Sequence, residues 1–437
     1  MDKQSPVSVF WFRRDLRLDD NAGLYHALKS NNPVLPVFIF DKAILDQLED
    51  KDDARVTFIY QTVEALDKEL QQHGSSLLML YDKPEHAWLR LVKEHNITAV
   101  YTNHDYEPYA KLRDDAIAAD LKKHNVSFYT YKDQVIFERD EVIKDNGKPY
   151  TVYTPYMRKW YQQLTPFYLK AYPNKKYFKN FYQTKAFPIP SLKEMGFEKS
   201  NRGFPNLHYK ELISDYAEKR DFPAVKGTTH VGLHLRFGTV SIRELAGAAY
   251  TVTEKTWLNE LIWREFYMMI LYHFPHTADL AFRPEYDRIK WDNNEKQFEA
   301  WCKGETGYPL VDAGMRELNT TGYMHNRVRM VAASFLSKHL LIDWRWGERY
   351  FASKLLDYEM ASNVGGWQWS AGSGTDAAPY FRIFNPESQL KKFDPELLYV
   401  KKWVPEYADF SKYPKPIIDH AFARDRCLRA FKEALSK

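Results

Sequence analysis

Four polar or aromatic side chains recur at helical spacing in the segment WLNELIWREFYMMILYHF, which begins at Trp257. Glu260, Trp263, Arg264 and Tyr267 are three or four positions apart and share one helix face. Such a face suits nucleic-acid recognition, because a carboxylate bonds a base edge, a ring stacks on a base and a guanidinium pairs with phosphate. Taken locally, the pattern favours a simpler interpretation, an exposed Glu260–Arg264 ion pair beside two half-buried aromatic rings.

A basic cluster lies in the segment GYMHNRVRMVAASF. Asn326, Arg327, Arg329 and Met330 open a predicted helix, where free backbone N–H groups and the helix dipole favour anions. Two arginines at such a place indicate a site for a phosphate ester. An ordinary basic helix start explains them equally well.

Acids, glycines and tryptophans are combined in residues 355–386. Asp357 and Glu359 do not indicate a metal site, because no third ligand of suitable type follows them. The glycines beside Trp367 and Trp369 indicate that the backbone approaches something large and flat, such as a ring system.

Hydroxyl side chains precede a predicted helix in KGTTHVGLHLRFGTVS. Thr228 and Thr229 there are suited to a pyrophosphate group. His230 and His234 have the spacing of a zinc pair on a helix. Because neither an HExxH motif nor a thiolate cluster accompanies them, we expect no metal.

The elements that position these residues fall into two patterns. The first 130 or so residues alternate short apolar runs with amphipathic ones, which predicts a parallel sheet covered by helices on both faces. The expected strands are 7–12, 34–40, 77–80, 99–102 and 127–131, and the expected helices between them are 22–29, 56–71, 84–95 and 109–124. No GxGxxG follows the first strand, so the dinucleotide fingerprint is missing there.

The rest of the chain loses this alternation. We expect an α/β domain over residues 1–132, a connector rich in Pro, Lys and Tyr over 133–205, and an all-helical domain over 206–437. The helices expected in this last part are 241–251, 256–274, 326–341 and 346–357.

Composition excludes several classes of protein. Lys and Arg number 62 against 58 Asp and Glu, a formal charge of +4, so a nucleic-acid surface would be a local patch. Cys302 and Cys427, the two cysteines, form no disulfide framework, which favours a reducing compartment. No apolar run is long enough for a membrane span, and no signal peptide is visible. We therefore expect a soluble cytoplasmic protein.

The four segments, in this order, resemble the photolyase/cryptochrome family, and most of all the class I cyclobutane pyrimidine dimer photolyases. The similarity also covers WFRRDLRLDDN at 11–21, VYTPYMRKW at 152–160 and YPKPIIDHAFARDRCLRAFKEAL at 413–435. It implies an α/β parallel-sheet antenna domain followed by an all-helical domain that binds FAD and DNA.

The resemblance also implies a set of contact residues. The FAD contacts would be Tyr216, Thr228, Thr229, His230, Val231, Gly232, Trp257, Arg264, Asp357, Glu359 and Asn363. The DNA contacts would be Arg220, Glu260, Trp263, Asn326, Arg327, Met330, Trp369, Arg382 and Gln389.

The activity implied is light-dependent repair of cyclobutane pyrimidine dimers. Reduced FAD, excited by blue light, would pass an electron to a flipped-out dimer, whose ring splits before the electron returns. Glu260 would bond the dimer, and Asn363 would face the reactive nitrogen of the flavin. Trp367, Trp344 and Trp291 would re-reduce oxidised flavin, although packing in the core is the commoner role of tryptophan.

The chain departs from the family pattern at a few positions. The phosphate loop has T-T-H-V-G in place of T-S-R-L-S, with His230 at the basic position and Gly232 at a hydroxyl position. Glu359 replaces an Asp, and Val364 replaces an Asn. The two histidines that six-four photolyases carry near Asn326 are absent, which favours cyclobutane dimers as the substrate.

The antenna chromophore is predicted from one residue. Glu107 stands where folate-binding relatives place a carboxylate that bonds the pterin, so methenyltetrahydrofolate is the expected antenna, with a deazaflavin or a flavin left open. We expect a monomer that acts on DNA containing pyrimidine dimers, without a metal or a membrane. The alternative is a cryptochrome-type blue-light photoreceptor. Glu260, Trp263 and Met330 argue against it, because they match the residue pattern of the repair enzymes.

Overall fold

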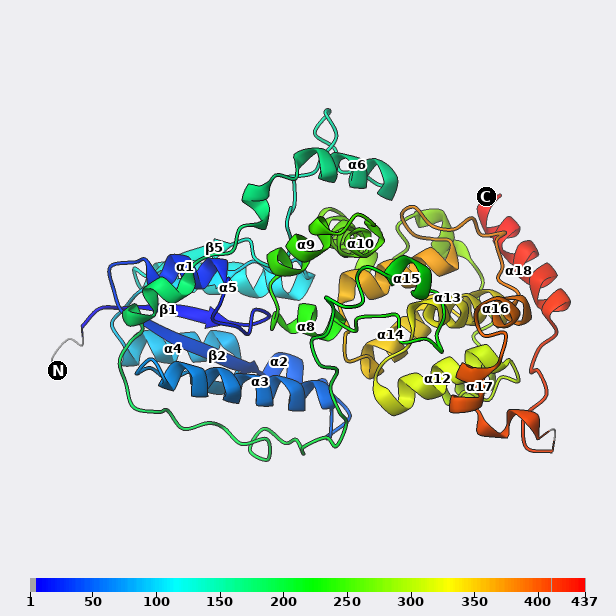
Figure 1. Ribbon diagram of the computed structural model, residues 1–437, viewed down its shortest axis with the longest axis horizontal. Coiled ribbons are helices and arrows are strands. Elements are labelled where there is room, and N and C mark those ends of the chain that lie inside the picture. The colour runs from blue at the N-terminus through cyan, green and yellow to red at the C-terminus, as the bar shows by residue number, and fades with distance from the viewer. Residues whose placement is uncertain (1–4, 410, 437) are drawn as a thin grey trace. The chain divides into compact units, whose positions relative to one another are not determined.

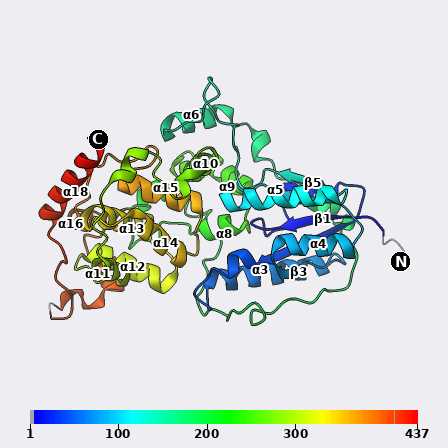
Figure 2. The ribbon, with the colours of Figure 1, turned by 180° about the vertical axis from the view of Figure 1, so that it is seen from behind.

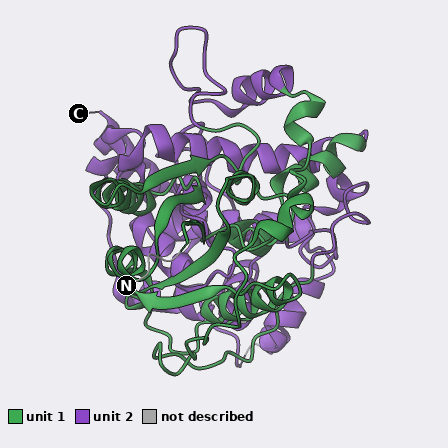
Figure 3. Cartoon of the chain, turned by 90° about the vertical axis from the view of Figure 1, so that its left-hand side faces the viewer, with its two compact units in different colours: residues 1–138, 164–206, 231–251 green, residues 139–163, 207–230, 252–437 purple. Residues whose placement is uncertain are grey.

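The computed structural model describes residues 5–409 and 411–436, which form two compact units. Unit 1 takes its described residues from 1–138, 164–206 and 231–251 (Figure 3). Unit 2 takes its described residues from 139–163, 207–230 and 252–437. No described helix combines the length and the apolar character that crossing a membrane requires.

Unit 1 is built on a five-stranded parallel sheet with the order β3-β2-β1-β4-β5 (Figure 1). The strands are β1 (Val7–Phe12), β2 (Val34–Asp41), β3 (Leu78–Asp82), β4 (Ile97–Asn103) and β5 (Ser127–Tyr131). The predicted α/β class is confirmed, and each expected strand is present with ends that shift by no more than two residues.

Helices cover both faces of this sheet, which explains why β1 and β2 are almost wholly apolar. Trp11 and Val37 pack in one cluster with residues of α4 (Pro84–Glu94) and α5 (Pro108–Lys123). On the other face, Phe40 meets Tyr60 of α3, and α1 approaches Phe10. Figure 2 shows α4 and α5 on the side of the strands that faces the viewer. The remaining helices of unit 1 are α1 (Ala22–Leu28), α2 (Lys42–Leu45), α3 (Ala54–Gln71), α8 (Gly232–Phe237) and α9 (Ile242–Thr251), with 3-10 turns Pro166–Leu169 and Asn174–Asn180.

A buried charge network joins distant segments of unit 1. The carboxylate of Asp133 accepts hydrogen bonds from Arg17 at 2.6 Å and from Arg243 at 2.7 Å, and its side chain is 1% exposed. Arg243 also donates to Asp20 at 2.7 Å. The network fixes Arg243, close to the start of α9, against the loop before α1 and the segment after β5.

Unit 2 is helical, as predicted for its residues beyond 206 but not for 139–163. Its helices are α6 (Tyr153–Gln163), α7 (Tyr216–Lys219), α10 (Thr256–His273), α11 (Glu295–Lys303), α12 (Pro309–Thr321), α13 (Asn326–Ser334), α14 (Trp344–Lys354), α15 (Met360–Ala371), α16 (Pro386–Phe393), α17 (Leu398–Trp403) and α18 (His420–Leu435). Short turns lie at Pro275–Ala278, Pro284–Arg288 and Pro405–Ala408.

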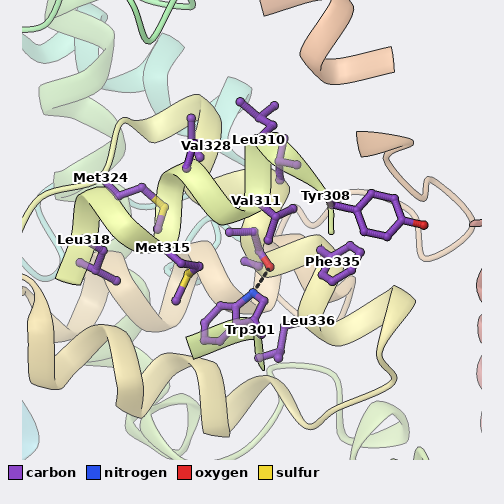
Figure 4. Packing of buried hydrophobic residues seen from close by; sticks show 14 of the residues in the cluster. Trp301, Tyr308, Leu310, Val311, Met315, Leu318, Met324, Val328, Phe335 and Leu336 are labelled. Carbon is purple, nitrogen blue, oxygen red and sulfur yellow. Dashed lines mark hydrogen bonds between the residues drawn. The ribbon is translucent and has the colours of Figure 1, made fainter. Parts of the chain in front are cut away.

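The core of unit 2 is built around Trp301, whose side chain is completely buried (Figure 4). Its indole N–H donates to the backbone oxygen of Ala332 at 3.2 Å, so the ring is fixed against α13. Residues of α12 to α18 also belong to this cluster.

Two predicted helices of unit 2 differ from the structure. The helix expected over 326–341 is α13 followed by a π-helical turn, Phe335–His339, which hydrophobic spacing cannot distinguish from an α-helix. The helix expected over 346–357 is α14, which ends at Lys354 and leaves Asp357 in the loop before α15. Helix α6 was not predicted, because it lies in the connector, whose sequence as a whole is rich in Tyr, Pro and Lys.

Candidate functional site

A cavity of about 430 Å³ opens among α10, α13, α14 and α15 of unit 2. Its walls bring together many of the predicted site residues, which are separated by up to about 150 positions in the sequence. Those that line it are Arg220, Glu260, Trp263, Arg264, Asn326, Met330, Asp357, Glu359, Asn363, Trp367 and Trp369.

The predicted face of α10 forms one wall of this cavity, since Glu260, Trp263, Arg264 and Tyr267 all line it. The simpler interpretation, an exposed Glu260–Arg264 pair, is wrong. Glu260 pairs with Arg220, and Arg264 donates to Glu359 at 3.0 Å with only 11% of its side chain exposed. Spacing along one helix could not show these partners, because they come from other segments.

Glu260 belongs to a line of alternating charges beside the cavity. Burial raises the pKa of the Glu260 carboxyl, and the neighbouring Arg220 guanidinium opposes that rise. Asp221, next to Arg220, pairs with Arg327 at 2.7 Å. The Arg327 guanidinium also lies 4.4 Å from the centre of the Phe393 ring. Two arginines predicted to contact DNA are therefore each paired with a carboxylate of the protein itself.

Asn363 is held by a residue that sequence reasoning missed. Its side-chain nitrogen donates to the Glu348 carboxylate at 2.9 Å and to the Glu348 backbone oxygen at 3.2 Å. Burial raises the pKa of the Glu348 carboxyl, which the bond from Asn363 offsets in part. With the nitrogen engaged, the side-chain oxygen of Asn363 is left to accept a hydrogen bond. The sequence holds one sign of this role. Glu348 lies four positions after Trp344, on the buried side of the same helix.

The glycine pair in α15 serves two purposes. A Cβ at Gly365 would lie 2.3 Å from the Tyr267 ring, so glycine is needed for that ring to pack against the helix. A Cβ at Gly366 would meet nothing within 4 Å, and Gly366 lines the cavity. One glycine thus admits a ring of the protein, while the other keeps the cavity open.

Comparison with known proteins matches both units of this fold. A family model described as "DNA photolyase" matches residues 8–176, and one described as "FAD binding domain of DNA photolyase" matches residues 257–412. The deoxyribodipyrimidine photo-lyase of Synechococcus sp. is 39% identical to the chain, over 94% of the chain and 93% of that protein. The chain belongs to the photolyase/cryptochrome family.

Solved photolyase structures share the whole architecture. A class III photolyase from Agrobacterium tumefaciens has a TM-score of 0.84 and 32% identity, covering 100% of this chain and 99% of that one. An archaeal photolyase from Sulfolobus tokodaii, solved with two FAD molecules, has a TM-score of 0.83 and 34% identity, covering 98% of this chain and 100% of that one. The predicted family is confirmed, whereas the narrower placement in class I stays a prediction.

The cavity of this photolyase-family chain suits a flat ring system such as that of FAD. A flat ring can lie against Gly366, where no side chain occupies the space. The polar groups that line the cavity include the Asn363 amide and the Arg264–Glu359 and Arg329–Asp357 pairs. Such a donor and acceptor set suits a ring system whose edges carry both carbonyls and N–H groups.

Several predicted FAD contacts lie away from the cavity walls. Trp257 is buried, stacks on Tyr209 at 5.8 Å between centroids, and donates its indole N–H to Thr229 at 3.3 Å. Thr228 lies 3.3 Å from the Tyr323 hydroxyl. Tyr216 begins α7 and lies beneath the guanidinium of Arg220. In unit 1, Val231 precedes Gly232, the first residue of α8.

His230 and His234 do not share a helix, although their spacing is that of a zinc pair on a helix. His230 precedes α8 and has a φ of +52°, so the two histidines do not share a helix face. Both ring nitrogens of His234 are engaged, with Thr239 at 2.8 Å and Pro205 at 2.9 Å. Among the described residues no group of three or more His, Cys, Asp or Glu could hold a metal ion.

The three tryptophans of the predicted electron path are placed in or against the core. Trp344 and Trp367 are each 2% exposed, and half-buried Trp291 packs on the same cluster. The ring of Trp367 contacts Phe351 at 5.0 Å and Trp301 at 6.0 Å between centroids. Of the three, Trp367 alone is among the residues that line the cavity. Their role in electron transfer stays a prediction.

The remaining predicted residues lie elsewhere. Arg382 is exposed in the loop before α16, and Gln389 lies on α16. In unit 1, the Glu107 carboxylate forms ion pairs with Arg14, at 3.0 Å, and with Arg236. The role of Glu107 toward an antenna chromophore stays a prediction.

Proposed function

We propose that this chain repairs cyclobutane pyrimidine dimers in DNA, using blue light and reduced FAD. One observation carries the proposal: a single cavity is lined by residues that the family resemblance assigns to FAD and by residues that it assigns to the lesion. Arg264, Asp357 and Asn363 belong to the first set, and Glu260 and Trp263 belong to the second. Two reacting groups held in one cavity are close enough for an electron to pass between them.

Supporting this assignment, the relative from Synechococcus is itself named a deoxyribodipyrimidine photo-lyase. We propose that residues 206–437 form the domain that binds FAD and DNA, that residues 1–132 form an antenna domain, and that residues 133–205 connect them. Methenyltetrahydrofolate is the antenna that Glu107 favours. The protein would act as a monomer.

Reduced FAD, when bound, would supply the chemistry of a light-driven one-electron donor. The residues of the chain would prepare this electron transfer. Asn363, whose side-chain nitrogen is held by Glu348, would offer its side-chain oxygen to a ring N–H of the flavin. Trp263, Trp367 and Trp369 also line the cavity, and ligands that fill it would displace water from around the reacting groups.

Glu260 and Trp263 would receive the lesion. Trp263 offers an aromatic surface for stacking, and Glu260 offers a hydrogen bond to a base edge. Arg220 and Arg327 would bind phosphates of the DNA. On binding DNA, each arginine would exchange its carboxylate partner, Glu260 for Arg220 and Asp221 for Arg327, for a phosphate oxygen.

The test uses purified protein with reduced FAD, a thymine-dimer oligonucleotide and blue light. We expect the dimer to be converted into two thymines, measured by the recovery of thymine absorbance and by chromatography. The same mixture in the dark is the control. A flavin-loaded, reduced protein that leaves the dimer intact under light would reject the proposal.

A further inference from the structure

Tyr153, the first residue of α6, lies flat against the indole of Trp263. The two ring centroids are 3.6 Å apart, and the ring planes differ by 7°. Tyr153 itself is buried, with 7% of its surface exposed. One face of Trp263 is therefore covered by protein, and a ligand in the cavity can meet only its other face and its edges.

The ring of Tyr153 is fixed without help from Trp263. Its hydroxyl donates to the backbone oxygen of Asn259 at 2.9 Å, and its backbone N–H donates to Asp376 at 3.0 Å. Burial raises the pKa of the Tyr153 phenol, so the hydroxyl keeps its proton and remains a donor. Phe266 meets the same ring edge-on, at 5.8 Å between centroids.

Helix α6 as a whole is fastened to the elements that build the cavity. Trp160 donates its indole N–H to Glu265 at 2.6 Å, and Tyr161 donates its hydroxyl to the side chain of Asn259 at 2.9 Å. Just before α6, the backbone oxygen of Thr151 accepts from the Thr375 hydroxyl at 2.6 Å. These bonds place Tyr153 at a defined height along α10.

We propose that Tyr153 is a positioning residue for lesion recognition, which holds the Trp263 indole in the orientation that stacks on the dimer. This inference rests on the proposed function. Because Tyr153 covers one face of the Trp263 indole, that ring has lost its rotamer freedom before the ligand binds. A base that stacks on the indole therefore does not incur the entropy cost of ordering it. The stack of two protein rings also adds an attractive contact that favours this one rotamer.

The test compares the full chain with FAD bound, kept in the dark, and variants of Tyr153. Fluorescence anisotropy gives the Kd for a duplex with one central thymine dimer and for the undamaged duplex of the same sequence. Tyr153→Leu removes the flat face, and we expect about fivefold weaker binding of the dimer, from the loss of one aromatic stack. Binding of the undamaged duplex should change by less than about twofold. Tyr153→Phe keeps the stack and should restore dimer binding.

A double-mutant cycle shows whether Tyr153 acts through Trp263. Trp263→Ala should weaken dimer binding by itself, and adding Tyr153→Leu to it should cause no further loss. Losses that multiply in the double variant would mean that Tyr153 acts independently of the indole, which would overturn the proposal.

The matched control is Tyr161→Leu. Tyr161 lies on the same helix and bonds the same Asn259, but its ring contacts Trp160 and not Trp263. It should leave dimer binding unchanged, whereas an equal loss in Tyr161→Leu would assign the effect to docking of α6. If Tyr153→Leu does not fold, Tyr153→Met keeps the volume without the flat face and carries the same expectation.

The outcomes separate the two proposals. If the wild-type chain binds damaged and undamaged DNA equally, the proposed function is wrong. If it discriminates but Tyr153→Leu discriminates just as well, only the positioning role of Tyr153 is wrong.

Discussion

Arginine–carboxylate pairs occur in both units, but their surroundings differ. In unit 1, Asp133 accepts from Arg17 and Arg243 and is almost inaccessible to solvent. In unit 2, Glu260 and Glu359 pair with Arg220 and Arg264 at the wall of a cavity. The first network joins segments of the fold, whereas the second lies beside open space that a ligand can enter.

This difference shows that a buried ion pair does not by itself mark a functional site. A charge that faces only protein stabilises the fold if its partner stays in place, and breaking such a pair leaves an uncompensated charge. A pair beside a cavity can exchange one partner for a group of the ligand. The volume next to the charges is therefore the deciding feature.

The largest effect on stability is expected in unit 1. Asp133→Asn would leave Arg17 and Arg243 without their shared carboxylate, and we expect the free energy of unfolding to fall by about 3–5 kcal/mol. Urea unfolding followed by circular dichroism measures this loss. Asp120→Asn, at a more exposed ion pair of the same unit, is the control and should change stability by less than about 1 kcal/mol. If Asp133→Asn lowers the free energy of unfolding only slightly, the two units do not differ in how much their ion pairs matter for stability.

Glu260→Gln should show the opposite pattern. The side chains of Glu260 and Arg220 are about 30% exposed, so the free energy of unfolding should change by less than about 1 kcal/mol. Repair under limiting blue light should fall about tenfold or more, because a hydrogen bond to a charged group in the cavity is lost. Glu218→Gln, exposed on α7, is the control. Normal repair by Glu260→Gln would contradict the role given to this carboxylate.

The adjacent glycines of α15 separate packing from ligand space. In Gly365→Ala the new methyl group would collide with the Tyr267 ring, so we expect a loss of about 1–3 kcal/mol in the free energy of unfolding. In Gly366→Ala the helix gains up to about 1 kcal/mol, but the methyl group enters the cavity and should lower the flavin content of the purified protein. Thermal melts and the flavin-to-protein absorbance ratio measure the two effects. If Gly366→Ala keeps its full flavin content, the flavin ring does not lie against Gly366.

The smallest effect concerns the N-terminus of α13. The His325 side chain caps this helix by accepting from the Arg327 N–H at 3.2 Å. Burial, together with the nearby Arg329, lowers the pKa of His325 to about 4 from an ordinary value of 6.5. Between these values the unfolded chain binds more protons than the folded one, so the free energy of unfolding should decrease as the pH falls from about 6.5 to about 4.

His325→Asn tests this pH dependence, because asparagine keeps a capping oxygen but does not titrate. Its unfolding free energy should change less with pH in this range, by up to about 1.4 kcal/mol per pH unit relative to the wild type. His339, whose pKa burial lowers to about 3, should leave part of the slope in both proteins. If the unfolding free energies of the two proteins depend on pH with the same slope, then the pKa of His325 is not lowered in the folded state.

Local spacing was sufficient to predict several features of the site. The shared face of Glu260 and Trp263 follows from the period of one helix, and both residues line the cavity. The strands were predictable because a sheet buried on both faces requires nearly continuous apolar runs. The glycines beside Trp367 correctly indicated a close approach to a flat group, and at Gly365 that group is the ring of Tyr267.

Partners from distant segments could not be predicted in this way. Arg220 reaches Glu260 across 40 positions, and Tyr153 reaches Trp263 across 110, so no periodicity relates them. Glu348 was missed because an acid in a helix is usually exposed, and only the fold turns it toward Asn363. The π-helical turn after α13 was missed because it adds residues to a turn without changing their hydrophobic character.

The side chain of Gln368 has a consequence for how the sequence of α15 can change. It accepts from the Phe282 N–H at 2.8 Å and donates to the backbone oxygens of Thr277 and Leu280 at 2.9 and 3.0 Å. These three bonds lock the rotation of α15 about its own axis. One inserted or deleted residue in the helix would turn everything beyond it by about 100°. Evolution can therefore exchange individual side chains along α15, but it cannot readily change the length of this helix.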